Sequence, residues 1–99
     1  MRARMLVASG LLALGAAQAP LIGIEDFKYL PPALAVPAGT TVSWVNHDAE
    51  LHTVTSSSGA FASPGLEKGE TFSYTFAAPG AYAYFCALHP YMTATITVK

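Results

Sequence analysis

Short runs in which apolar and polar residues alternate dominate the sequence from residue 22 onward, and no run there repeats with the period of a helix. Alternation with a period of two is typical of strands that bury one face. Clusters of Pro and Gly separate the runs and mark turns. We therefore expect strands in residues 22–30, 33–36, 40–46, 51–56, 70–76, 81–86 and 93–99.

These segments predict an all-β fold of seven to eight short strands, because their near-regular spacing is that of a sandwich. We expect antiparallel pairing with Greek-key connections. Residues 22–30 are interpreted as one continuous strand, with Phe27 and Tyr29 on the same face. Trp44 and Phe72 are expected in the core.

The first 19 residues have the features of an export leader. Arg2 and Arg4 precede an apolar run that is short for a membrane span. Ala17–Ala19 has the small-x-small pattern of a signal-peptidase site. We predict a signal peptide at 1–19 and one domain at 20–99, with no stable membrane insertion after cleavage. A leader that is retained as an anchor is the alternative.

Without the leader, the chain keeps three lysines against six Asp and Glu residues, so its formal net charge is −3. The basic residues form no stripe, and nucleic-acid binding therefore has no electrostatic support. A domain of this size has a small core, and exported domains of such size often add disulfides or a metal. The chain has one cysteine, which excludes an internal disulfide.

That cysteine begins the most informative motif of the sequence. Cys86, His89 and Met92 follow one another in the order C-x2-H-x2-M, at the end of a predicted strand. Pro90 restrains the backbone directly after the histidine. Alone, a cysteine or a methionine is more often a buried apolar residue. Together, three metal-binding side chains on one short loop indicate a metal site.

A fourth ligand must come from another part of the chain. His52 is the best candidate, because an adjacent strand would place it beside the end of the Cys86 strand. His47 is a weaker rival and is expected in a solvated loop. Two imidazoles, a thiolate and a thioether are the donor set of a blue-copper electron-transfer site. Zinc is the alternative metal, although it rarely accepts methionine.

The same segments resemble the cupredoxins, and most closely the amicyanin and plastocyanin group. The segment "YAYFCALHPYM" is similar to the ligand loop of amicyanin, and "AGTTVSWVNHDAELHTVTS" is similar to the segment that carries the first copper histidine. The resemblance covers nearly all of residues 22–98. It implies His52, Cys86 and His89 as in-plane copper ligands and Met92 as the axial ligand. It also implies a tyrosine corner at Tyr82 and a loop-bracing role for Thr53.

The function predicted from these observations is electron transfer by one type 1 copper ion, without chemistry on a substrate. By resemblance, redox proteins are expected to dock near His89 and Pro90, and a monomer is expected. The leader and the lack of a second cysteine favour the bacterial periplasm, with the surface of a Gram-positive cell as the alternative location. Copper storage or delivery is the alternative function. An enzyme is not expected, because three histidines are too few for a second copper cluster beside this site.

Overall fold

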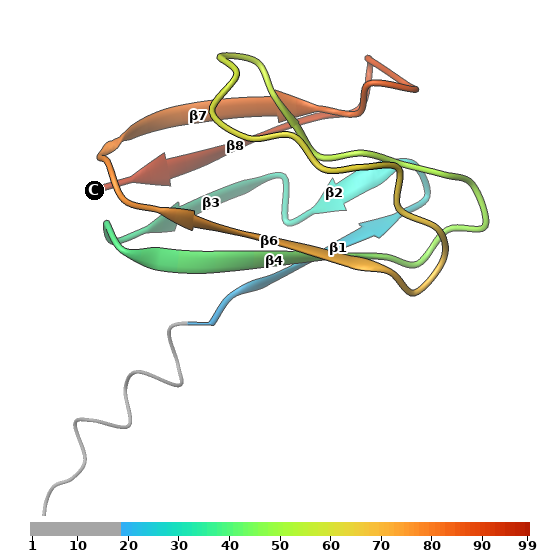
Figure 1. The fold of residues 1–99 in the computed structure, drawn as a ribbon, viewed down its shortest axis with the longest axis horizontal. Coiled ribbons are helices and arrows are strands. Elements are labelled where there is room, and N and C mark those ends of the chain that lie inside the picture. The colour runs from blue at the N-terminus through green and yellow to red at the C-terminus, as the bar shows by residue number, and fades with distance from the viewer. Residues whose placement is uncertain (1–18) are drawn as a thin grey trace, which may run out of the picture.

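The computed structural model describes residues 19–99 and contains eight strands in two layers (Figure 1). The first sheet has the order β2-β1-β4-β6 and the second the order β3-β8-β7-β5. The strands are β1 (Leu21–Glu25), β2 (Lys28–Leu30), β3 (Ala33–Val36), β4 (Thr40–Asn46), β5 (Thr55–Ser56), β6 (Thr71–Phe76), β7 (Gly80–Phe85) and β8 (Thr93–Val98).

The all-β sandwich predicted from the alternating pattern is confirmed, but both sheets are mixed. β1 pairs parallel with β4, and β3 pairs parallel with β8. The remaining strand pairs are antiparallel. The expectation of antiparallel pairing throughout was therefore wrong at two places. Alternation shows which face of a strand is buried, whereas it carries no information about the direction of the neighbouring strand.

The core lies between the two sheets and is built around Trp44, which is fully buried. Its indole Nε1 donates a hydrogen bond to the Tyr84 hydroxyl at 3.2 Å, so the two sheets are joined by a polar contact inside an apolar core. Phe72 packs against the core from a partly buried position. Tyr82 donates its hydroxyl to the Ala78 carbonyl at 2.7 Å, as expected for a tyrosine corner.

Two predicted strands are broken in the structure. The segment 22–30 is a hairpin, because Asp26 and Phe27 form a turn between β1 and β2. The segment 51–56 is mostly irregular: His52 makes an isolated bridge to Leu66, and only β5 is regular. The turn was missed because it lacks the Gly or Asn that usually occupies positive φ. Both breaks lie beside the predicted metal site.

The predicted signal peptide falls almost entirely outside the described residues. Within residues 19–99, no helix is long and apolar enough to cross a membrane.

Candidate metal centre

The C-x2-H-x2-M loop is the connection between β7 and β8, and backbone hydrogen bonds shape it. The Cys86 N–H donates to the Met92 carbonyl at 3.1 Å, which extends the ladder between the two strands. The His89 N–H donates to the Cys86 carbonyl and the Met92 N–H donates to the His89 carbonyl, so two consecutive four-residue turns complete the loop. A spacing of three residues brings the three side chains to one end of the sandwich.

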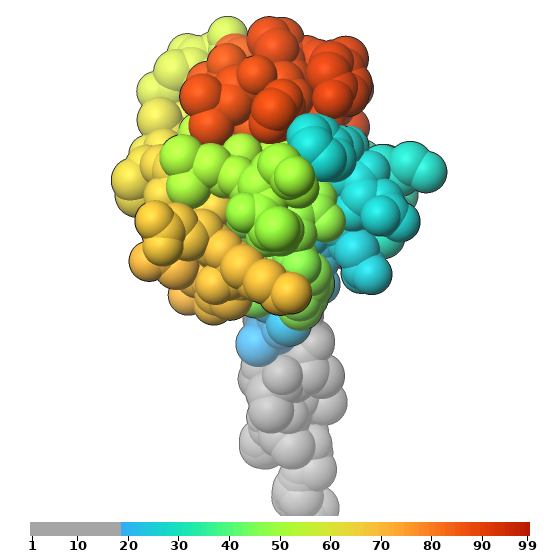
Figure 2. Space-filling model, turned by 90° about the vertical axis from the view of Figure 1, so that its right-hand side faces the viewer, coloured from blue at the N-terminus to red at the C-terminus, as the bar shows by residue number. Residues whose placement is uncertain are grey.

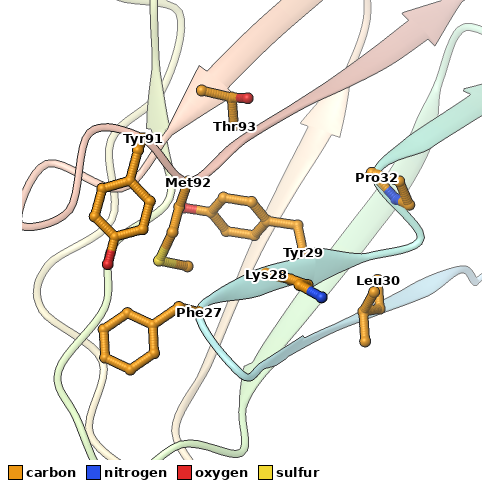
Figure 3. A pocket seen from close by; sticks show the side chains of 8 residues that line it. All are labelled: Phe27, Lys28, Tyr29, Leu30, Pro32, Tyr91, Met92 and Thr93. Carbon is orange, nitrogen blue, oxygen red and sulfur yellow. The ribbon is translucent and has the colours of Figure 1, made fainter.

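The structure brings His52, Cys86 and His89 together. One donor atom from each lies within 4.8 Å of the others. His52 and Cys86 are fully buried, whereas His89 is partly exposed. Met92 is buried in the same loop and lies beside Phe27 and Tyr91 in a small surface pocket of about 170 Å³ (Figure 3).

His47 is not part of this cluster. It is exposed on the loop after β4, where its ring lies against Gly23. This position matches the expectation that His47 is a solvated residue.

The orientation of the His52 ring is set by Asp48. Nε2 of His52 lies 2.8 Å from the Asp48 carboxylate, and Nδ1 lies 3.8 Å from the Cys86 sulfur. A proton on Nε2 is therefore donated to the carboxylate, which leaves the Nδ1 lone pair directed toward the sulfur. A carboxylate behind a histidine in this way fixes the tautomer of a metal-binding imidazole.

Asp48 also accepts hydrogen bonds from the backbone N–H groups of Asp26 and Phe27, each at 2.9 Å. Burial acts to raise the pKa of Asp48. The Phe27 and Asp26 N–H groups and the His52 ring outweigh it, so the pKa lies below its usual value. The side chain is therefore an anion with three donors around it.

The sulfur of Cys86 also has a hydrogen-bond donor. The Thr53 N–H points to it at 3.3 Å, and the Thr53 hydroxyl accepts the Ala87 N–H at 2.7 Å. Both groups brace the loop next to the cysteine, which is the role that the resemblance implied for Thr53. An N–H donor stabilises a thiolate and withdraws electron density from it, and such contacts tune a bound metal.

Asn46 shapes the loop that precedes His52. Its amide donates to the carbonyls of Glu50 and Leu66 at 2.9 and 2.8 Å, and its carbonyl oxygen accepts the Asp48 N–H at 2.9 Å. Asn46 is fully buried, so these bonds satisfy polar groups that water cannot reach. These bonds hold the loop in the conformation that places the Asp48 carboxylate next to Nε2 of His52.

The contributions of Phe27, Asn46 and Asp48 to the site were not predicted from the sequence. Asp48 precedes His52 by four residues, which is the only sequence signal that connects the two. Asn46 is the last residue of β4, the strand that carries Trp44, and a side-chain amide at such a position often closes the following loop. Phe27 was placed within a strand because the turn that carries it was not predicted.

The residues present fit a copper ion. The site combines a buried thiol, two imidazoles and a buried thioether, and a carboxylate and a backbone N–H already hold two of these groups. Thiolate and thioether suit Cu(I), and imidazole suits both oxidation states. Residues 4–98 match the family model of the cupredoxin-like domain. The chain belongs to the cupredoxin family.

Two comparisons place the chain near the amicyanins within this family. It is 38% identical over 88 residues to amicyanin from Paracoccus versutus, covering 84% of this chain and 67% of that protein. It superposes on the structure of an oxidised amicyanin variant with a TM-score of 0.79 and 33% identity, covering 84% of each chain. The chain spans about two thirds of the length of the curated relatives that it matches.

A further structural neighbour is a copper-containing nitrite reductase from Thermus scotoductus. The TM-score is 0.77 and the identity 31%, and the match covers 82% of this chain but only 22% of that chain. The nitrite reductase is therefore related to this cupredoxin through one domain.

Proposed function

We propose that this cupredoxin is a type 1 copper electron-transfer protein, with His52, Cys86, His89 and Met92 as the ligands. The convergence of the first three donor atoms within 4.8 Å is the observation that carries the proposal. The bound copper supplies a one-electron couple between Cu(II) and Cu(I). The cupredoxin does no further chemistry and acts as a carrier rather than as an enzyme, in line with its likeness to amicyanins.

The surroundings of the ligands suit such a carrier because they restrict movement. Asp48 orients the His52 ring, the Thr53 N–H lies against the Cys86 sulfur, and backbone hydrogen bonds close the loop. Ligands that stay in place during a change of oxidation state keep the reorganisation energy small. The buried thiol and the buried His52 also exclude water from one side of the site.

Electrons enter and leave at the partly exposed His89. Three large apolar side chains lie exposed on the loops at this end, Leu51, Leu88 and Tyr91, with exposed fractions of 42%, 50% and 73%. Figure 2 shows the ligand loop, the loop that precedes His52 and the β1–β2 turn meeting on one face. This apolar end, with Pro90 beside His89, is where redox partners dock. Weak redox complexes bury little area, so a small patch is sufficient.

The carrier acts as a monomer in the bacterial periplasm. The leader-like residues 1–19 and the relationship to amicyanins of Paracoccus support export. Expression of the whole chain in a Gram-negative host, followed by mass spectrometry of the periplasmic fraction, tests the cleavage. A mature protein that begins at Pro20 is expected, whereas a membrane-bound full-length chain would contradict it.

The test of the copper site is the visible absorption spectrum of residues 20–99 with one equivalent of Cu(II), beside a Cys86→Ala control. An intense blue thiolate-to-copper band is expected, which ascorbate bleaches reversibly and which the control lacks. A faint band that is the same in both proteins would refute the type 1 site and would favour copper storage or delivery.

A further inference from the structure

The turn between β1 and β2 has an unusual backbone. Glu25 pairs with Lys28, and the two residues between them, Asp26 and Phe27, have φ angles of 55° and 59°. Two-residue hairpins of this kind favour Asn-Gly or Asp-Gly, so Asp26 suits its position. Phe27 does not, because a bulky side chain strains the backbone at positive φ. A non-glycine residue in this region costs about 1–3 kcal/mol and persists only where its surroundings impose it.

Asp48 provides that constraint. Its two carboxylate oxygens accept the N–H groups of both turn residues, and one of them also accepts Nε2 of His52. One carboxylate thus connects the strained turn with a ligand of the proposed copper site. A change in the position of the turn is therefore coupled to the orientation of the His52 ring.

The side chain that the turn presents lies against both histidines. The Phe27 ring centroid is 4.8 Å from that of His52 and 4.8 Å from that of His89, with interplanar angles of 84° and 68°. The two imidazoles are themselves 5.2 Å apart. Figure 3 shows Phe27 at the hairpin end, on the same side as the Met92 thioether and the Tyr91 ring.

The position of the His89 ring depends more on contacts with neighbouring aromatic rings than the position of the His52 ring does. His52 is fully buried and has Asp48 behind its ring. His89 is partly exposed, and its imidazole makes no hydrogen bond to another group within residues 19–99. Its ring contacts are to Phe27, His52 and, at 6.2 Å, to the exposed Tyr91.

We infer that Phe27 is a positioning residue for the two histidines, and that the strained turn exists to direct its ring against them. The identity of the ion rests on the proposed function, whereas the effect on the two imidazoles does not. By holding His89 at a set distance from His52, the ring preforms the site before the metal binds. It also covers one side of the site against water.

The first test uses the protein without metal. Histidine ring signals in NMR spectra are compared between the native protein, Phe27→Ala and Phe27→Tyr. The alanine variant is expected to show increased motion of the His89 ring, while the tyrosine variant keeps the native behaviour. Phe72→Ala is the matched control, because Phe72 is also a partly buried aromatic residue but lies against Trp44, at 5.8 Å.

The second test measures the release of Zn(II) to a chelator, since zinc binds Cys and His and has no redox chemistry. Release is expected to be about tenfold faster in Phe27→Ala than in the native protein, and unchanged in Phe72→Ala beyond its loss of stability. A factor of ten corresponds to about 1.4 kcal/mol in the barrier.

A third variant covers the case in which Phe27→Ala does not fold. Phe27→Gly removes the ring and also relieves the strain at positive φ, so the turn itself is favoured. This variant is expected to fold and to show the same mobile His89 and rapid zinc release. A native-like His89 ring and native zinc release in the folded glycine variant would overturn the inference.

These outcomes are independent of the copper proposal. If the native protein forms no blue band, the proposed function fails, while the NMR comparison in the metal-free protein still decides the role of Phe27. If the blue band forms and His89 is equally fixed in all variants, the positioning role fails alone.

Discussion

The backbone N–H of Thr53 lies 3.3 Å from the sulfur of Cys86, although the two residues are 33 positions apart in the sequence. The Thr53 hydroxyl adds a second link by accepting the Ala87 N–H. The segment after His52 and the ligand loop are therefore tied together at the cysteine and at the residue that follows it. This relationship leads to a test that separates the hydroxyl from the N–H.

Thr53→Val removes the hydroxyl but keeps the backbone N–H at the sulfur. The Ala87 N–H then loses its acceptor, and we expect a loss of about 1 kcal/mol in the free energy of unfolding. The blue band is expected to remain close to its native wavelength. Urea unfolding and absorption spectra measure the two effects. Thr53→Ser is the control and should behave like the native protein; equal destabilisation in both variants would show that the hydroxyl bond is unimportant.

Asp48→Asn replaces the anion behind His52 with a neutral amide. The amide cannot accept all three hydrogen bonds equally well. Its NH₂ group can also donate to Nε2 of His52, which leaves the ring proton on Nδ1, the nitrogen that faces the Cys86 sulfur. Loss of such a partner typically weakens metal binding about 10–100-fold. Competition with a chelator measures the affinity for Cu(II). Glu50→Gln, an exposed carboxylate on the same loop, is the control. An unchanged affinity in Asp48→Asn would contradict the orienting role.

Tyr84→Phe leaves the indole N–H of the buried Trp44 without its acceptor. An unsatisfied buried donor costs about 1–3 kcal/mol, so we expect a loss of that size in stability by denaturant unfolding. The copper spectrum should not change, because the lost contact lies in the core. Trp44→Phe combined with Tyr84→Phe provides the double-mutant cycle. Additive losses would show that the hydrogen bond contributes little.

Removal of copper is expected to lower the melting temperature. A metal that binds only the folded state adds about 4 kcal/mol to the free energy of unfolding when its free concentration is about a thousand times the dissociation constant. For a domain of this size, each kcal/mol corresponds to about 4–8 °C, so the copper form should melt at least about 15 °C higher. Calorimetry compares the two forms, with Cys86→Ala as a control that copper should not stabilise. Identical melting curves would mean that copper does not tie the loops together.

Leu88→Glu places a charge in the proposed docking end without touching a donor atom. Electron exchange between the oxidised and reduced protein requires no other partner and is measured by NMR line broadening. We expect the rate of this exchange to decrease about tenfold in the variant. The introduced glutamates of the two copies repel each other, and the apolar contact between the copies is lost. Leu21→Glu is the control: Leu21 is similarly exposed, at 59% against 50%, but begins β1. Equal slowing by both changes would argue against docking at Leu88.

The two-layered β-sandwich could be predicted from the sequence, and so could the clustering of the metal-binding side chains. The two predictions rest on different reasons. Buried and exposed residues alternate in β4 and β8 as the pleat requires, so these strands could be predicted from the sequence pattern. Cys86, His89 and Met92 lie near one another because the loop is short. The approach of His52 could only be proposed, since it depends on which strands neighbour each other.

The groups that hold the donors were not predictable in this way. Asp48 acts through three hydrogen bonds that link the turn to His52, and such bonds between loops leave no periodic pattern in the sequence. The turn at Phe27 contradicts local propensity and is imposed by tertiary contacts. Sites at which local preference and structure disagree are often functional.

Both ends of the described domain lie away from the copper site. β1 runs toward the loop that carries Asp48, so it begins at the far end, and β8 runs away from the ligand loop toward Lys99 (Figure 1). A tether on either end would leave His89 facing outward. The domain could thus be attached to a membrane or to another redox domain and still exchange electrons, with the tether setting the local concentration of its partner.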